Sequence, residues 1–204
     1  MPRLGLAALA LCVAAGCSSK DSTKLNEAPV PKYDAEAIAK AALADFDKDG
    51  NGSIDASEAR ACPALSASFA AIDTNGDRKI SADEIKKRVE AYAAGSTGSV
   101  PVAILVQMDG KALVDATITL VPEACMSSVL KTATAKTNQE GLCNEFQIDG
   151  KNYRGLAAGW YKIQVTKEGA NVPARYNTQT TLGTEIIHDT RRGEASVQLF
   201  LGSR

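Results

Sequence analysis

Two short runs of the chain carry oxygen-bearing side chains at nearly every second position. The first, DKDGNGSIDASE, covers residues 47–58, and the second, DTNGDRKISADE, covers residues 73–84. Carboxylates this close together repel one another unless a cation neutralises them. A hard cation such as Ca²⁺ takes about six to eight oxygen ligands, and one flexible loop can supply them when alternate side chains turn inward. The two runs therefore predict a calcium cofactor of one or two ions.

The first run supplies an oxygen ligand at every position that such a loop requires. Side chains serve at positions one, three, five, nine and twelve, the ninth through a water, and a backbone carbonyl serves at position seven. In chain order these residues are Asp47, Asp49, Asn51, Ser53 (carbonyl), Asp55 and Glu58. Gly52 at position six permits the sharp bend, and Ile54 at position eight is placed to pair with the second run. A disordered acidic turn is the alternative interpretation.

The second run has the same arrangement with one departure. Its predicted ligands are Asp73, Asn75, Asp77, Lys79 (carbonyl), Ser81 and Glu84. Position six is Arg78, and a non-glycine residue in the left-handed region costs about 1–2 kcal/mol. Arg78 and Lys79 also bring positive charge close to the ion, so we expect about tenfold weaker binding here. Ile80 keeps position eight, so a contact with Ile54 should couple the two loops.

Helical patterns flank both runs, and together they resemble the EF-hand family. Apolar residues recur at spacings of three and four through 35–46, 65–72 and 85–92. Two capping-box patterns, Asp55-x-x-Glu58 and Ser81-x-x-Glu84, mark helix starts, and Pro63 suits the first turn of another helix. The resemblance implies a small all-α domain of four helices over residues 34–95. The basic run at 85–90 is interpreted as a solvated helix face.

The spacing of the loops favours structural calcium over a switch. Only 14 residues separate Glu58 from Asp73, which resembles the compact EF-hand pairs of exported bacterial proteins. That spacing leaves little room for an opening motion, and no Met-rich groove is visible. A calcium-responsive sensor remains the alternative.

The N-terminus resembles a bacterial lipoprotein signal. Arg3 supplies a basic start, and the apolar stretch of residues 4–15 is too short to span a bilayer. The sequence Ala14-Ala15-Gly16-Cys17 resembles a lipobox, although that family has a branched residue where Ala14 stands. The resemblance implies a signal peptide over 1–16, acylation of Cys17 and export to a bacterial membrane as a lipid anchor. Ser18 after the cysteine implies the outer membrane; an ordinary secretory signal is the alternative.

Between the signal and the helices, the polar residues 17–33 predict a flexible tether of roughly 20 Å. Residues 96–101 are a linker by composition, rich in Gly and Ser.

From residue 102 the pattern changes to short alternating segments, VAILVQ, DATITLVP, KTATAKT, NEFQI, GWYKIQV and ASVQLFL. Such segments, separated by turn residues, predict an all-β antiparallel sandwich over 102–204. The chain is thus expected to be multidomain, with Trp160 and Tyr161 in the core of its second half.

Four stretches of this second half resemble the transthyretin-like (prealbumin-like) or carboxypeptidase-regulatory-like sandwich. They are DGKALVDATITLVP, TNQEGLCNEFQI, GLAAGWYKIQV and VPARYNTQTTL. A departure is the longer insert around residues 125–128. That fold is a scaffold attached to many functions, so it does not decide function by itself.

Cysteine content adds one expectation for an exported protein. Cys12 leaves with the signal and Cys17 carries lipid, so three cysteines remain in an oxidising compartment. Cys125 and Cys143 lie in the same C-terminal region and are predicted to form a disulfide, with Cys62 as a buried free thiol.

These observations favour a binding or scaffold protein and exclude some classes. Lys and Arg (23) nearly balance Asp and Glu (24) and are scattered, so no nucleic-acid surface is expected. A transthyretin-like hydrolase relies on several histidines and a terminal Tyr-Arg-Gly-Ser-type motif, whereas this chain has one histidine and ends FLGSR. No enzyme is predicted. The expected partners are the membrane, through the anchor, and a protein or surface polymer; a calcium-dependent relay is the second candidate.

Overall fold

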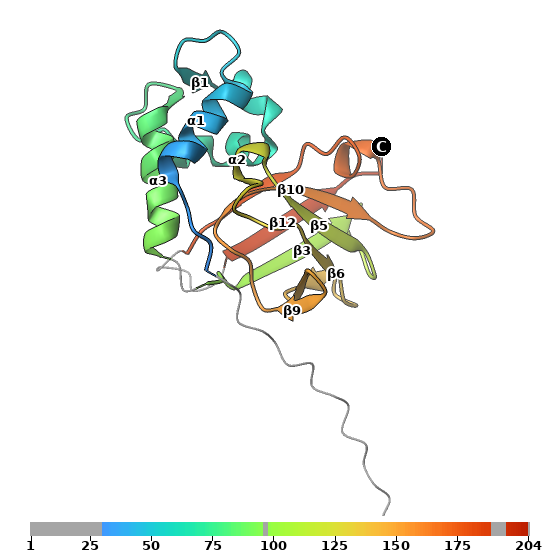
Figure 1. Ribbon diagram of the computed structural model, residues 1–204. Helices are drawn as coiled ribbons and strands as arrows, with labels where there is room; N and C mark the ends of the chain where they lie inside the picture. Colours follow the sequence, from blue (N-terminus) through green and yellow to red (C-terminus); the bar gives the residue numbers. More distant parts are fainter. Residues whose placement is uncertain (1–29, 96–97, 189–194, 204) are drawn as a thin grey trace, which may run out of the picture.

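The computed structural model describes residues 30–95, 98–188 and 195–203 (Figure 1). The predicted signal peptide, Cys17, most of the tether and residues 96–97 of the linker lie outside the described residues. Figure 1 shows the helices gathered at one end of the β-sheets, with the acidic loops at the far tip. The packed structure begins before Asp34, because the Tyr33 hydroxyl donates a hydrogen bond to the Ala158 carbonyl at 2.7 Å.

The helical region contains α1 (Ala35–Phe46), η1 (Glu58–Ala61), α2 (Pro63–Ile72) and α3 (Ala82–Ala94). Two of the expected start signals are present: Ser81 with Glu84 forms a capping box on α3, and Pro63 stands in the first turn of α2. The Asp34 side chain caps α1. The expected helix after the first loop is only the short 3-10 helix η1. It stops at Ala61 because Pro63 disfavours helical geometry in the residue before it, and Cys62 is extended at φ −121° and ψ 93°.

A two-stranded sheet joins the acidic loops. β1 (Ser53–Asp55) pairs antiparallel with β2 (Lys79–Ser81), and Ile54 lies opposite Ile80. Both isoleucine side chains are 0% exposed. The predicted contact between the position-eight residues is therefore confirmed.

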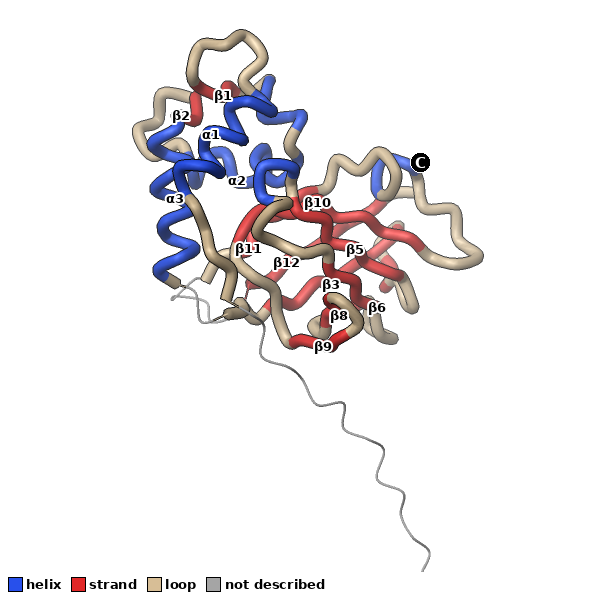
Figure 2. Tube along the Cα trace, viewed as in Figure 1, coloured by secondary structure: helices blue, strands red, loops and turns tan. Residues whose placement is uncertain are grey.

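Two larger sheets follow (Figure 2). The six-stranded sheet has the order β11-β10-β5-β6-β8-β9, and the other has the order β12-β3-β4 with β7 also on β3. The strands are β3 (Val102–Met108), β4 (Lys111–Ala112), β5 (Thr117–Pro122), β6 (Ala133–Lys136), β7 (Leu142–Cys143), β8 (Phe146–Ile148), β9 (Lys151–Tyr153), β10 (Gly159–Thr166), β11 (Gly183–Ile186) and β12 (Ala195–Leu201). Short 3-10 helices, η2 (Ala124–Met126) and η3 (Ala174–Tyr176), lie in the connections.

All six segments that the sequence marked as strand candidates contain strands, but the pairing is not wholly antiparallel. β12 pairs with β3 in parallel, with Ala195 opposite Val102 and Leu201 opposite Met108. The prediction of a purely antiparallel region was wrong here because alternation within a strand does not specify the direction of its neighbour.

One hydrophobic core runs through both regions. Trp160 and Tyr161 are adjacent on β10, yet both are buried. The Trp160 ring packs edge-on against Tyr92 of α3, with ring centroids 6.1 Å apart. The helices thus cover one face of β10, and the predicted core role of both aromatic residues is confirmed. Within the described ranges, no helix combines the length and apolar character that crossing a membrane requires.

The predicted disulfide between Cys125 and Cys143 was wrong. Among the described residues, Cys62, Cys125 and Cys143 are all free and buried. Cys143 lies in β7 beside Ile104 of β3, whereas Cys125 lies in η2, after the last residues of β5. Closeness in the sequence was a poor guide because the two strands belong to different sheets.

Candidate metal centre

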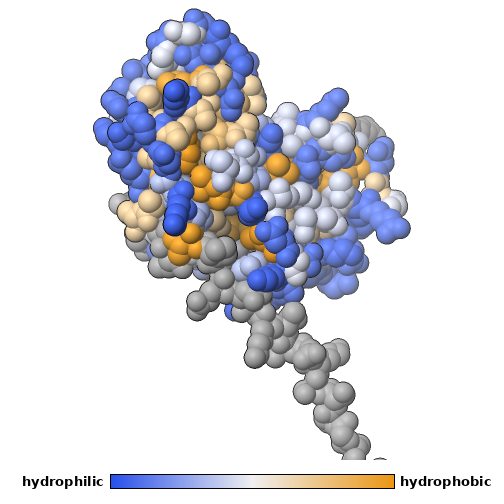
Figure 3. Space-filling model, in the orientation of Figure 1, coloured by the Kyte–Doolittle hydropathy of each residue, from blue (hydrophilic) through white to orange (hydrophobic). Residues whose placement is uncertain are grey.

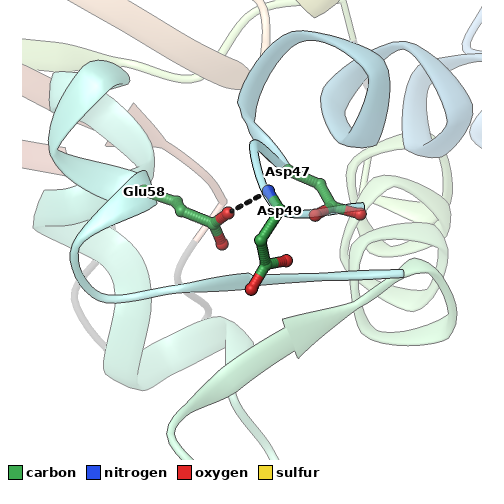
Figure 4. Close-up of side chains that lie close together, drawn as sticks. All are labelled: Asp47, Asp49 and Glu58. Carbon is green, nitrogen blue, oxygen red and sulfur yellow. Dashed lines mark hydrogen bonds between the residues drawn. The ribbon is translucent and has the colours of Figure 1, made fainter. Parts of the chain in front are cut away.

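The first acidic loop brings three carboxylates together. Asp47 follows the end of α1, and Glu58 opens η1. One carboxylate oxygen from each of Asp47, Asp49 and Glu58 lies within 4.8 Å of the other two. Figure 4 shows these three side chains lying close together. This spacing fits oxygen ligands around one divalent cation. Figure 3 shows hydrophilic side chains gathered over this end of the molecule.

The Asp47 carboxylate shapes the loop around itself. Its Oδ1 accepts from the Gly50 N–H at 2.8 Å, and its Oδ2 accepts from the Gly52 N–H at 2.8 Å. Gly52 has φ +83°, a left-handed conformation that glycine adopts without steric cost. The bend predicted at position six is therefore confirmed.

Glu58 closes the loop from the opposite side. Its Oε1 accepts from the backbone N–H groups of Lys48 at 2.7 Å and Asp49 at 3.3 Å, the latter shown dashed in Figure 4. Its Oε2 accepts from the Asp55 N–H at 2.8 Å. The position-twelve carboxylate thus faces into the loop and needs little movement to meet an ion there.

The second loop repeats these contacts position by position. Glu84 accepts from the N–H groups of Thr74 at 2.9 Å and Ser81 at 2.9 Å, as Glu58 does from Lys48 and Asp55. Asp73 Oδ1 accepts from the Gly76 N–H at 2.7 Å. The two loops therefore share one backbone framework although their side chains differ.

Arg78 adopts the conformation expected of a glycine. Its φ is +66°, and its N–H donates to Asp73 Oδ2 at 3.0 Å, which matches the contact between Gly52 and Asp47. The departure predicted at position six therefore lies in the residue type, while the backbone conformation is retained.

The remaining predicted ligands line the same loops. Asn51 Oδ1 accepts from the Ser53 N–H at 3.1 Å, and Asp55 Oδ1 accepts from the Glu58 N–H at 3.0 Å. In the second loop, Asp77 accepts from the Asn75 amide at 3.0 Å and from the Lys79 N–H at 2.8 Å. Among the described residues, only the first loop brings three carboxylates within the spacing given above.

Hydrogen bonding favours the ionised form of several of these carboxylates. The Asn51 side chain and N–H lower the pKa of Asp49, and the Ser57 hydroxyl lowers the pKa of Asp55. Burial alone would raise the pKa of Glu84, but hydrogen bonds from Ser81 and Thr74 lower it on balance. Ionised carboxylates are the form that binds a cation.

Sequence reasoning missed the backbone donors that orient the two position-twelve glutamates. Those donors are N–H groups at positions two, three and nine of each loop, and every residue type other than proline carries one. Only the spacing within the motif could have pointed to them.

Comparison with known proteins agrees with the geometry. A family model for the EF hand matches residues 39–62 and residues 65–89, so each match covers one acidic loop with parts of its flanking helices. A search of curated proteins found no match. EF hands bind calcium with carboxylate, amide and carbonyl oxygens. Residues 39–89 therefore match the EF-hand family in sequence, and the first loop also gathers carboxylates of the kind that calcium binding needs.

Proposed function

We propose that this protein is an exported, lipid-anchored calcium-binding scaffold in which calcium is mainly structural. The single observation that supports calcium binding best is the convergence of Asp47, Asp49 and Glu58. In the first loop the ion would be held by these carboxylates with Asn51, the Ser53 carbonyl and Asp55. In the second loop it would be held by the equivalent set, from Asp73 to Glu84.

A structural role is favoured by the way α2 is held. Sensor EF hands open by moving one helix of each pair away from the other. Here α2 packs along β11, and its Ala64 N–H donates to Glu123 of the β region at 3.1 Å. An opening motion of α2 would break these contacts, which supports stable binding over a switch.

The anchor and the scaffold role are supported by sequence alone. The lipobox-like stretch ending at Cys17 supports a membrane anchor, and residues 102–204 support a transthyretin-like scaffold for a protein or surface polymer. We assign no catalytic residue. The second candidate is a calcium-responsive relay, which the tandem loops favour if binding exposes an apolar surface.

Calorimetric titration of the calcium-stripped protein tests calcium binding. The Glu58→Gln variant replaces the last carboxylate of the first loop with a neutral amide. Its matched control is Glu140→Gln, in an exposed turn of the β region. We expect binding by the unaltered protein and Glu140→Gln, with most of the first-loop heat lost in Glu58→Gln. Equal titrations for all three would remove the first loop from the proposal.

Two further measurements test the rest. A dye that fluoresces on apolar surfaces should give no added signal when calcium is added; a rise would favour the relay.

Metabolic labelling with palmitate in a bacterial host should mark the unaltered protein and Cys12→Ser but not Cys17→Ser. Labelling of the Cys17→Ser variant would argue against the anchor.

A further inference from the structure

We propose that the β region sets the calcium affinity of the loops by clamping α2 and α3, with Glu123 and Gly183 as positioning residues. The inference rests on the calcium binding proposed above and adds a regulatory part to that site. Neither residue belongs to an acidic loop, and neither would touch an ion. Each acts on the helices that carry the ligands.

Helix α2 connects the two loops directly. Glu58, the last ligand of the first loop, opens η1, which ends at Ala61, and α2 begins at Pro63. At the other end, α2 stops at Ile72 and Asp73 begins the second loop. A shift of α2 must therefore displace ligands of both loops.

Glu123 of the β region holds the start of α2. Pro63 has no N–H and the Cys62 side chain makes no cap hydrogen bond, so the Ala64 N–H takes its acceptor from outside the helix. Glu123, only 1% exposed, fills that role: its Oε1 accepts from the Ala64 N–H at 3.1 Å, and Lys162 Nζ lies 3.8 Å from its Oε2. Burial raises the pKa of Glu123, which the Ala64 N–H and Lys162 partly offset.

Gly183 brings the backbone of β11 against the same turn. A Cβ atom at this residue would lie 2.1 Å from the Ala64 nitrogen and 2.2 Å from the Pro63 carbonyl carbon. Both neighbours are backbone atoms, which cannot rotate away as a side chain can. Any residue larger than glycine must therefore push α2 off the sheet.

Helix α3 is clamped by the next part of the same strand. Glu185 of β11 accepts two hydrogen bonds from Arg88, each at 2.6 Å, and a third from the Tyr92 hydroxyl. The basic run at 85–90 was predicted to be a solvated face, and for Arg88 this was wrong because Glu185 lies opposite. Helix α3 begins two residues before Glu84 and so carries the last ligand of the second loop. The strand β11 therefore restrains the helix that follows each loop.

The clamp should therefore preorganise the ligands. Apparent affinity falls in proportion to the fraction of molecules in the binding-competent state. Loosening α2 would lower that fraction, and we expect a loss of about threefold to tenfold in calcium affinity. By thermodynamic reciprocity, calcium should in turn tighten the junction between the helices and β11.

The test compares Gly183→Ala with Gly95→Ala in the full-length protein. Gly95 has φ −85°, and a Cβ there would meet its nearest atoms at 3.4 Å and 3.5 Å, so the substitution is a matched control. Calcium affinity is measured by titration. Fluorescence of Trp160, the only tryptophan in the chain, reports on the junction without calcium.

We expect Gly183→Ala to weaken calcium binding threefold to tenfold and to shift the Trp160 emission in calcium-free buffer, while Gly95→Ala changes neither. A folded Gly183→Ala protein with unaltered affinity would overturn the clamp. If the unaltered protein bound no calcium, the proposed calcium-binding function would fail. The Trp160 emission shift in Gly183→Ala would still report the contact between β11 and α2.

A second pair of variants decides the matter if Gly183→Ala does not fold. Glu123→Gln keeps an acceptor for the Ala64 N–H, whereas Glu123→Ala removes it. The clamp predicts near-normal calcium affinity for Glu123→Gln and weaker binding for Glu123→Ala. Equal affinity in this pair would contradict it.

Discussion

Replacing Arg78 by glycine should strengthen calcium binding at the second loop. Arg78 occupies position six at φ +66°, where the first loop has Gly52 at φ +83°. The substitution removes steric strain from the left-handed conformation, and it removes a positive charge close to the expected ion. Both changes favour the loaded loop.

The size of the effect follows from these two contributions. Relief of strain gives about 1–2 kcal/mol, and the greater freedom of glycine in the ion-free loop offsets about 0.5–1 kcal/mol of it. A unit charge about 8 Å from a divalent ion in bulk water costs about 1 kcal/mol, and salt screens roughly half of that because the side chain is exposed. Only part of the strain term acts on binding, since the loop already has this conformation. We expect a net gain of about 1 kcal/mol, or about fivefold in affinity.

The assay is calcium titration in a Glu58→Gln background, so that the second loop dominates the signal. Arg78→Ala separates the two contributions, because it removes the charge and keeps a Cβ; about twofold tighter binding is expected for it. Arg78→Lys keeps both features and should bind as the unaltered loop does. Affinity of Arg78→Gly equal to or below that of Arg78→Lys would refute the reasoning.

Three further predictions concern packing, the junction and the thiols. Ile54→Ala should lower the free energy of unfolding by about 2–4 kcal/mol in denaturant titrations, since the side chain is 0% exposed; a loss below about 0.5 kcal/mol would contradict its core role. Glu185→Gln should cost about 1–3 kcal/mol by leaving the half-buried Arg88 without its carboxylate, and an Arg88→Met second change should restore part of that; additive losses would argue against the pairing. Burial raises the pKa of Cys125 and of Cys143 to about 12, so both thiols should resist alkylation at pH 9 until the chain is unfolded; rapid labelling of the native protein would contradict this.

The acidic loops were predictable from sequence because their chemistry is local. Twelve consecutive residues carry the ligands, the bend and the residue that pairs the loops, so spacing alone indicated Ile54 opposite Ile80. The strands at 102–108 and 159–166 were predictable for the same reason, since alternation lies within each segment.

Contacts between distant segments were not predictable in this way. β11 has little apolar alternation, with Gly183, Thr184 and Glu185 in its four residues, and it was missed. Its role depends on Pro63 and Arg88, which lie about a hundred residues earlier in the chain. Cysteine pairing failed for a related reason, because sheet membership is set by pairing partners and not by proximity in sequence.

The most direct test of calcium binding is an amide NMR titration that observes each loop separately. The Gly52 N–H donates to Asp47 and the Arg78 N–H donates to Asp73, so each amide reports on the first ligand of its own loop. We predict that calcium shifts both resonances, Gly52 at the lower concentration, while equal concentrations of potassium shift neither. If neither amide responded up to about 10 mM calcium, well above the range in which extracellular EF-hand modules bind, the assignment of these loops as calcium sites would be wrong.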